Sequence, residues 1–203
     1  MDTQERYRDS TDQVLPLPPG TIGPEAGSGP AEALWAVGGD GRGRRWHVLH
    51  VKSRQEKMLS QDLTAMGIWH YLPLVSQLRH YGKRQVVVER PLFPCYVFLK
   101  GSLDEAYQAD RTKRVARVIP VADQEQIDWE LRNLRLALSS RTPLGPYPFL
   151  RKGIRVEVRA GPLRGLQGVI EGWAKADRLI LQVEILGRAA SLEIDGALLD
   201  PVG

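Results

Sequence analysis

Four histidines and one cysteine are the side chains of this sequence that could ligate a metal ion or act as a nucleophile: His47, His50, His70, His80 and Cys95. His47 and His50 lie in a strand-like segment, where residues three apart point to opposite faces and do not converge on one ion. Cys95 has no neighbouring pattern of a base and an orienting group. As the only cysteine, it forms neither an intrachain disulfide nor a cysteine-type zinc site. The sequence therefore predicts no metal, no cofactor and no enzyme activity.

An aromatic segment bracketed by two prolines suits a different chemistry, the docking of an apolar partner. Pro91 and Pro94 enclose Leu92 and Phe93, and a strand-like run follows over residues 95–99. Proline fixes its own φ and pushes the preceding residue towards extended geometry. We therefore expect a rigid, partly exposed aromatic residue beside the edge of a sheet.

The candidate docking residues are the aromatic side chains of this segment and two residues before it. They are Phe93, Tyr96 and Phe98, extended by Tyr71 and Leu72. Desolvated aromatic anchors contribute about 2 kcal/mol or more each at protein interfaces. Tyr96 and Phe98 share one strand face, so the alternative is that both point inward as core residues.

The positive charge of the chain is concentrated in its middle. The net charge is +4, of which residues 1–41 carry −5, residues 42–150 carry +8 and residues 151–203 carry +1. This distribution predicts a polyanionic partner, such as nucleic acid, near residues 42–150. The alternative is a solvated basic surface. The candidate nucleic-acid contacts are Lys52, Arg54, Lys57, Lys83 and Arg84.

The predicted elements that position these residues follow the order β-α-β-β-β-α-β-α, which indicates a mixed sheet with helices packed on it. They are a strand over 46–51, a helix over 53–67, an extended segment over 69–78, a hairpin tip over 80–84, strands over 85–89 and 95–99, a helix over 104–109, a strand over 115–121 and a helix over 123–138. Ser53 with Glu56, and Asp123 with Gln126, have the spacing of capping boxes.

The remaining segments differ in composition. Residues 1–44 are acidic and rich in glycine and proline, which predicts a disordered tail. Residues 140–149 contain three prolines and predict a semi-rigid linker. Residues 150–203 alternate apolar and polar positions between glycines, which favours a small closed β-barrel. No apolar run approaches the ~20 residues of a membrane-spanning helix, and together with the single cysteine this predicts a cytoplasmic location. We also expect a monomer.

Four motifs in order resemble the NusG family of transcription elongation factors. WHVLHVKSRQE at 46–56 resembles the opening of the NusG N-terminal (NGN) domain, and PLFPCYVFL at 91–99 resembles its Phe-Pro-x-Tyr signature. KGIRVEVRAGPLRGLQGVIEG at 152–172 resembles a KOW motif, and ILGRAASLEID at 185–195 is similar to the last hairpin of the KOW barrel. The resemblance implies an α+β fold, with an NGN domain over 45–139 and an SH3-like KOW barrel over 150–203.

The resemblance also implies a function. The NGN domain would bind the clamp helices of RNA polymerase, touch non-template or upstream DNA, and suppress pausing or termination. The KOW barrel would recruit Rho or the small ribosomal subunit through Leu163, Leu166, Leu186 and Arg188. The prolines at 91 and 94 resemble the RfaH, LoaP and UpxY branch of specialised antiterminators, while Gln108 to Asp110 depart from the RfaH contact to the polymerase gate loop. A ribosome- or RNA-binding KOW protein without polymerase activity is the alternative.

Overall fold

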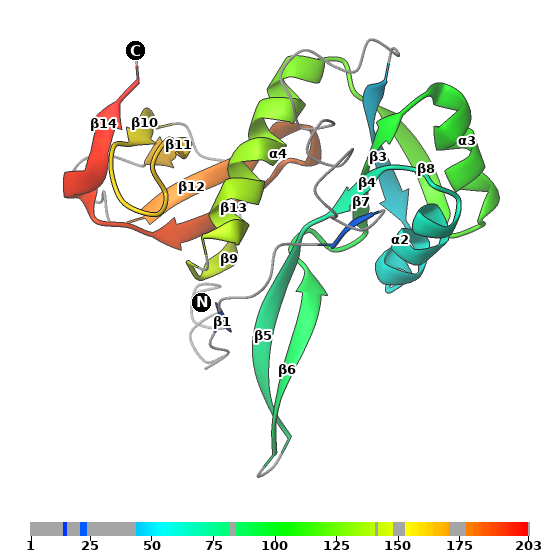
Figure 1. Ribbon diagram of the computed structural model, residues 1–203, viewed down its shortest axis with the longest axis horizontal. Coiled ribbons are helices and arrows are strands. Elements are labelled where there is room, and N and C mark those ends of the chain that lie inside the picture. Colours follow the sequence, from blue (N-terminus) through cyan, green and yellow to red (C-terminus); the bar gives the residue numbers. More distant parts are fainter. Residues whose placement is uncertain are drawn as a thin grey trace, which may run out of the picture.

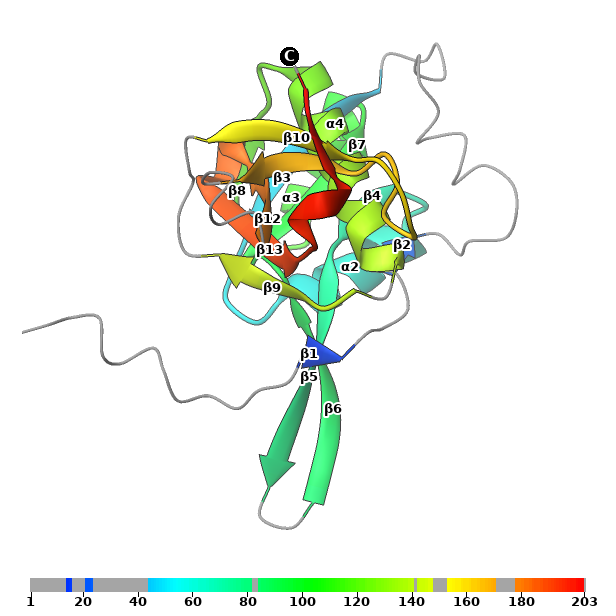
Figure 2. The same cartoon turned by 90° about the vertical axis from the view of Figure 1, so that its left-hand side faces the viewer.

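The computed structural model describes residues 14–15, 21–23, 44–81, 84–140, 142–147, 153–170 and 178–202. Their strands form three antiparallel sheets. We call these the first sheet, the hairpin sheet and the C-terminal sheet. Figure 1 shows helix α4 between the first sheet and the C-terminal sheet. The hairpin formed by β5 and β6 projects away from both in Figure 1 and in the view of Figure 2.

The first sheet has the strand order β2-β4-β7-β3-β8. Its strands are β2 (Thr21–Gly23), β4 (His70–Leu72), β7 (Tyr96–Gly101), β3 (Arg45–Val51) and β8 (Val115–Pro120). Its helices are α2 (Glu56–Ala65), α3 (Leu103–Arg111) and α4 (Gln124–Ser139). A mixed α+β architecture is therefore confirmed for this part of the chain.

The two faces of the first sheet are covered by different helices. Strand alternation places Leu49 and Leu99 on one face, where they join a buried cluster with residues of α2 and α3. Val48 and Phe98 lie on the opposite face and join a second cluster with Leu131 of α4. The predicted apolar stripe of α4 is confirmed, because its four residues are all buried: Ile127, Leu131, Leu134 and Leu138.

The predicted helix caps are only partly correct. Ser53 does not cap α2, because the backbone N–H of Gln55 donates to the carbonyl of Lys52 in a tight turn and α2 begins at Glu56. Asp123 caps α4 by accepting from the backbone N–H of Gln126, as predicted. The complete capping box of the structure, between Ser102 and Glu105 at the start of α3, was not predicted.

The hairpin sheet has the strand order β1-β5-β6. Its strands are β1 (Val14–Leu15), β5 (Leu74–Tyr81) and β6 (Arg84–Pro91). The predicted hairpin is confirmed by the continuous register from Leu74 opposite Pro91 to Tyr81 opposite Arg84. The prediction of a wholly disordered tail is wrong for β1 and β2, since these two segments add strands to the edges of β5 and β4.

The C-terminal sheet has six strands in the order β14-β10-β11-β12-β13-β9. They are β14 (Leu199–Pro201), β10 (Ile154–Val158), β11 (Gln167–Ile170), β12 (Arg178–Val183), β13 (Arg188–Glu193) and β9 (Leu144–Tyr147). The 3-10 turns η3 (Glu184–Leu186) and η4 (Gly196–Leu198) complete it. Within the described ranges no ladder joins β9 to β14, so the expected closure of a barrel is not confirmed.

The segment predicted as a linker is partly a strand of the C-terminal sheet. Leu144 to Tyr147 pair with β13, and Leu144 is buried. Pro146 is compatible with this position because β9 is an edge strand, where a missing backbone donor does not interrupt the sheet. The connection between α4 and the C-terminal sheet is therefore shorter than the sequence suggested.

Candidate functional site

The aromatic residues predicted for docking gather on the α4 face of the first sheet, but most of them are buried. Phe93 is 2% exposed, Phe98 0% and Tyr71 1%, and the rings of Tyr71 and Phe98 lie 6.5 Å apart. The expectation of a partly exposed Phe93 is wrong, because the cluster around it includes apolar residues of α4 and of the C-terminal sheet. Phe93 and Phe98 therefore belong to the core that would support a docking surface.

Tyr96 is the residue of this cluster that remains partly accessible. It is half-buried, and its ring lies 5.3 Å from the ring of His50, its cross-strand neighbour. The guanidinium of Arg188 on β13 lies 5.7 Å from the centre of the Tyr96 ring, which is cation–π distance. Tyr96 therefore lies where the first sheet meets the C-terminal sheet.

Leu72 does not extend the same patch. Although it follows Tyr71 directly, strand alternation turns it to the opposite face, and it is buried in the cluster formed with α2 and α3. Adjacent residues of one strand do not line the same surface, so the prediction that Leu72 extends the docking patch is wrong.

Cys95 has a backbone role. Its φ of +69° lies in the left-handed region that favours glycine. Its backbone N–H donates to Oε1 of Glu56 at 2.8 Å, and its carbonyl accepts from the N–H of Val51 at 2.8 Å. Glu56, expected to complete a cap on α2, instead anchors the proline-bracketed loop to that helix.

Three of the predicted nucleic-acid residues lie at one end of the first sheet, after β3 and at the start of α2. Lys52, Arg54 and Lys57 are exposed, and Lys57 forms a weak surface pair with Glu89 at 3.5 Å. Lys83 and the side chain of Arg84 lie outside the residues that the structure describes.

A second basic segment that the sequence reasoning missed lies beside the first. The backbone N–H of Lys52 donates to the carbonyl of Arg114 at 2.8 Å, which brings the loops after β3 and α3 together. Arg111, Lys113 and Arg117 are exposed on this second segment. The pairing of β3 with β8 is non-local, so no spacing in the sequence reveals this cluster.

The residues predicted to bind a partner through the C-terminal sheet divide into two groups. Leu163 and Leu166 are buried in its core, so the expectation that they line a surface is wrong. Leu186 is half-buried on η3 and Arg188 is exposed at the start of β13. Ile185, on the same 3-10 turn as Leu186, is half-buried and packs against the apolar cluster.

The histidines form no metal site in the part of the chain that the structure describes. His70 is fully buried, its Nε2 lies 2.7 Å from the Ser60 hydroxyl, and its Nδ1 lies 3.0 Å from the carbonyl of Ile68. Burial lowers the pKa of His70, which keeps the ring neutral. This enclosed pair joins α2 to β4 and offers no access to a substrate.

A polar network that the sequence did not reveal ties α4 to the first sheet. The Asp128 carboxylate accepts from Trp46 Nε1 at 2.8 Å and from Lys100 Nζ at 2.9 Å, and it also accepts from Arg132. Partial burial alone would raise the pKa of Asp128, but these three donors hold it below its ordinary value. The network fixes the position of α4 across the aromatic face.

Comparison with known families finds a similarity over part of the chain. Residues 44–131 match the NusG family, described as transcription termination factor nusG. The match extends from the start of β3 to the middle of α4 and includes Tyr96, Trp46, Lys100 and Asp128. The NusG family consists of transcription factors and not of enzymes. The C-terminal sheet lies outside the match.

The comparisons with solved structures and with curated proteins do not extend this family match. Among solved structures, the chain is similar to one described as the crystal structure of the MjSpt4:Spt5 complex in conformation B. The sequence identity is 16%, the TM-score is 0.28, and the alignment covers 78% of this chain and 97% of that chain. A TM-score this low carries no argument about this protein. No curated protein matches the chain. No described helix is both long and apolar enough to cross a membrane.

Proposed function

We propose that this protein is a NusG-like transcription elongation factor that binds the clamp helices of RNA polymerase beside Tyr96. The NusG-family match of residues 44–131 is the observation that carries this proposal. The half-buried ring of Tyr96 supports it, because an aromatic side chain on a rigid sheet is a typical interface anchor. Phe93, Phe98 and Tyr71 lie in the buried cluster behind the anchor and hold it in position.

In this proposal the factor suppresses pausing or termination, as a specialised antiterminator of the RfaH, LoaP and UpxY type. The C-terminal sheet acts as a KOW domain that recruits Rho or the small ribosomal subunit, with Leu186 and Arg188 as accessible contacts. Polymerase binding at Tyr96 requires Arg188 to leave the tyrosine ring. The two sheets therefore cannot keep their present contact while the factor is bound in this way.

The proposal predicts that Tyr96→Ala weakens binding of the full-length chain to purified RNA polymerase by about tenfold or more, since a desolvated aromatic anchor contributes about 2 kcal/mol. Tyr107→Ala is the matched control, because Tyr107 is a 53% exposed tyrosine on α3, a helix that packs on the opposite face of the first sheet. Affinity is measured by titration, together with the melting temperature of each variant.

Two results decide against the proposal. If Tyr96→Ala binds polymerase as tightly as the wild type, Tyr96 is not the anchor. If the wild-type chain binds ribosomes or RNA and shows no affinity for polymerase, the alternative of a ribosome- or RNA-binding KOW protein is correct.

The proposed contact to non-template or upstream DNA rests on the two adjacent basic loops. Replacing Lys52, Arg54 and Lys113 by alanine is expected to weaken DNA binding of the full chain. It is also expected to reduce the slope of log K against log salt by about 2–3, because about 0.9 counterion is released per phosphate contact. Arg159→Ala is the control, as this exposed arginine lies on the C-terminal sheet. An unchanged slope in the triple variant contradicts the assignment.

A further inference from the structure

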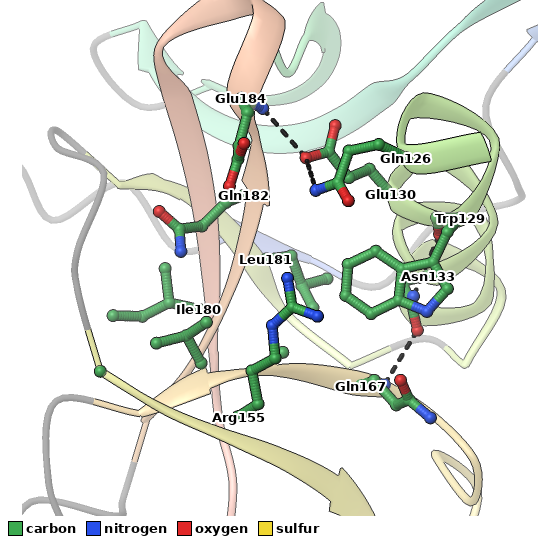
Figure 3. Close-up of a pocket in the computed structure, with 13 residues that line it drawn as sticks. Gln126, Trp129, Glu130, Asn133, Arg155, Gln167, Ile180, Leu181, Gln182 and Glu184 are labelled. Atoms are coloured by element: carbon green, nitrogen blue, oxygen red, sulfur yellow. Dashed lines mark hydrogen bonds between the residues drawn. The ribbon is translucent and has the colours of Figure 1, made fainter. Parts of the chain in front are cut away.

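The contact between α4 and the C-terminal sheet contains polar groups as well as apolar ones. Oδ1 of Asn133 accepts from the backbone N–H of Gln167 on β11 at 2.8 Å. The guanidinium of Arg155 on β10 lies 5.6 Å from the centre of the Trp129 ring. These groups line a pocket of about 220 Å³ between the helix and the sheet, which Figure 3 shows. We call this contact the α4 interface.

Glu130 occupies an unusual position in the α4 interface, because it is a carboxyl group that is 3% exposed and has no cation among its hydrogen-bond partners in the described structure. Its Oε1 accepts from the backbone N–H of Glu184 on η3 at 3.1 Å and from Nε2 of Gln126 at 2.9 Å. Figure 3 shows both bonds converging on this carboxyl group. Glu130 thus bridges α4 to the C-terminal sheet.

The charged groups facing Glu130 from the packed elements do not stabilise its anion. Asp123 at the start of α4 and Glu184 on η3 are both acidic and disfavour a second negative charge. Arg155 of β10 lines the same pocket, but its guanidinium lies against Trp129. Burial raises the pKa of Glu130 to about 7, aided by these two carboxylates and opposed by the bonds from Gln126 and Glu184.

We propose that Glu130 is a proton-controlled clamp, which holds the C-terminal sheet against α4 when protonated and releases it when ionised. Separation of the two parts exposes Glu130 to water, where it ionises at its ordinary pKa of 4.5. The closed arrangement therefore binds the proton more tightly than the open one. Its stabilisation is fully present below pH 4.5 and is lost as the pH rises to about 7.

The size of the pH effect follows from the two pKa values of Glu130, about 7 in the closed state and 4.5 in the open state. The ratio of closed to open protein is expected to fall about 30-fold between about pH 5.5 and about pH 8.5. In the closed state Arg188 lies against Tyr96, so the clamp also controls access to that ring. The clamp itself concerns only the two parts of this chain and does not depend on the polymerase proposal.

The experiment measures the separation of the two parts by the distance between spin labels in the full-length chain. Cys95→Ser removes the native thiol, and Asp104→Cys on α3 and Arg164→Cys in the C-terminal sheet provide two exposed attachment sites. We expect one narrow distance distribution at about pH 5.5 and a broader population at longer distances at about pH 8.5, because the equilibrium shifts about 30-fold.

Two variants test whether Glu130 is the titrating group. Glu130→Gln keeps an oxygen that accepts from Glu184 but cannot ionise, so its distribution should stay narrow at both pH values. Glu184→Gln is the matched control. It leaves the backbone N–H of the bridge intact, and the pH response should persist with a lower midpoint because one repulsive carboxylate is gone.

Each outcome supports the clamp or overturns it. A wild-type distribution that is the same at both pH values overturns it. So does a Glu130→Gln chain that opens at high pH like the wild type, since another group must then titrate. Loss of the pH response in Glu184→Gln would assign the effect to Glu184 instead. Glu130→Ala, which removes the acceptor, should be open at both pH values, and a closed Glu130→Ala chain also contradicts the proposal.

Discussion

Phe98→Ala is expected to lower the free energy of unfolding by about 3–5 kcal/mol, the usual cost of emptying a large buried aromatic site. Phe98 is fully buried at the centre of the first sheet and packs in the cluster that reaches α4 and the C-terminal sheet. Its neighbours on β3 and β4, Val48 and Tyr71, are held by strand pairing and cannot collapse into the cavity. Urea denaturation measures the change.

Val87→Ala is the control for this prediction, because Val87 lies on the hairpin and is 49% exposed. Its effect should stay within about 0.5 kcal/mol, as for other surface substitutions. A cost for Phe98→Ala below about 1 kcal/mol would show that this ring is not a core residue. The result also guides binding assays, since a polymerase defect in Phe98→Ala would reflect unfolding and not a lost contact.

Asp128→Ala is the second large effect, with an expected loss of about 2–4 kcal/mol. The substitution removes the carboxylate that accepts from the largely buried ammonium of Lys100 and from the indole N–H of Trp46. Removing one partner of a buried ion pair costs about 3–5 kcal/mol, and the partial exposure of Asp128 reduces that figure. Thermal and urea unfolding of the full chain provide the measurement.

Asp62→Ala is the matched control for Asp128→Ala. Asp62 pairs with Arg114 at 2.6 Å, but both side chains are about a third exposed, so its removal should cost about 1 kcal/mol or less. In addition, Lys100→Met in the Asp128→Ala background should recover part of the loss, because it removes the largely buried charge that Asp128 neutralises. Equal costs for the two aspartates would mean that the network around Asp128 is an ordinary surface pair.

Local patterns in the sequence were sufficient to predict most of the secondary structure. The helical spacing of Ile127, Leu131, Leu134 and Leu138 identified α4, because an amphipathic stripe reports which face is buried. The alternation of β3 and β7 also placed Tyr96 and Phe98 on one face correctly. The prediction of a cap at Ser53 was wrong because Arg54 adopts a left-handed φ of +62° within a turn. The spacing of Ser53 and Glu56 does not indicate this turn.

The candidate site shows where local patterns stop being informative. Alternation places Tyr96 and Phe98 on one face of β7, but it does not show that Phe93 and Tyr71 join them or that α4 and the C-terminal sheet cover the cluster. The same limit applies to the second basic loop, which reaches Lys52 only through the pairing of β3 with β8. Both features depend on contacts between residues far apart in the chain.

The sequence alone predicted most of the strands and helices, the shared face of Tyr96 and Phe98 and the resemblance to the family that residues 44–131 match, because periodicity and short motifs are local properties. Tertiary packing alone decided which aromatic ring stays accessible, how Asp128 is neutralised and which groups surround the buried Glu130. Burial and electrostatic environment are set by neighbours that only the folded chain brings together, and these neighbours determine the pKa values and the surfaces on which function depends.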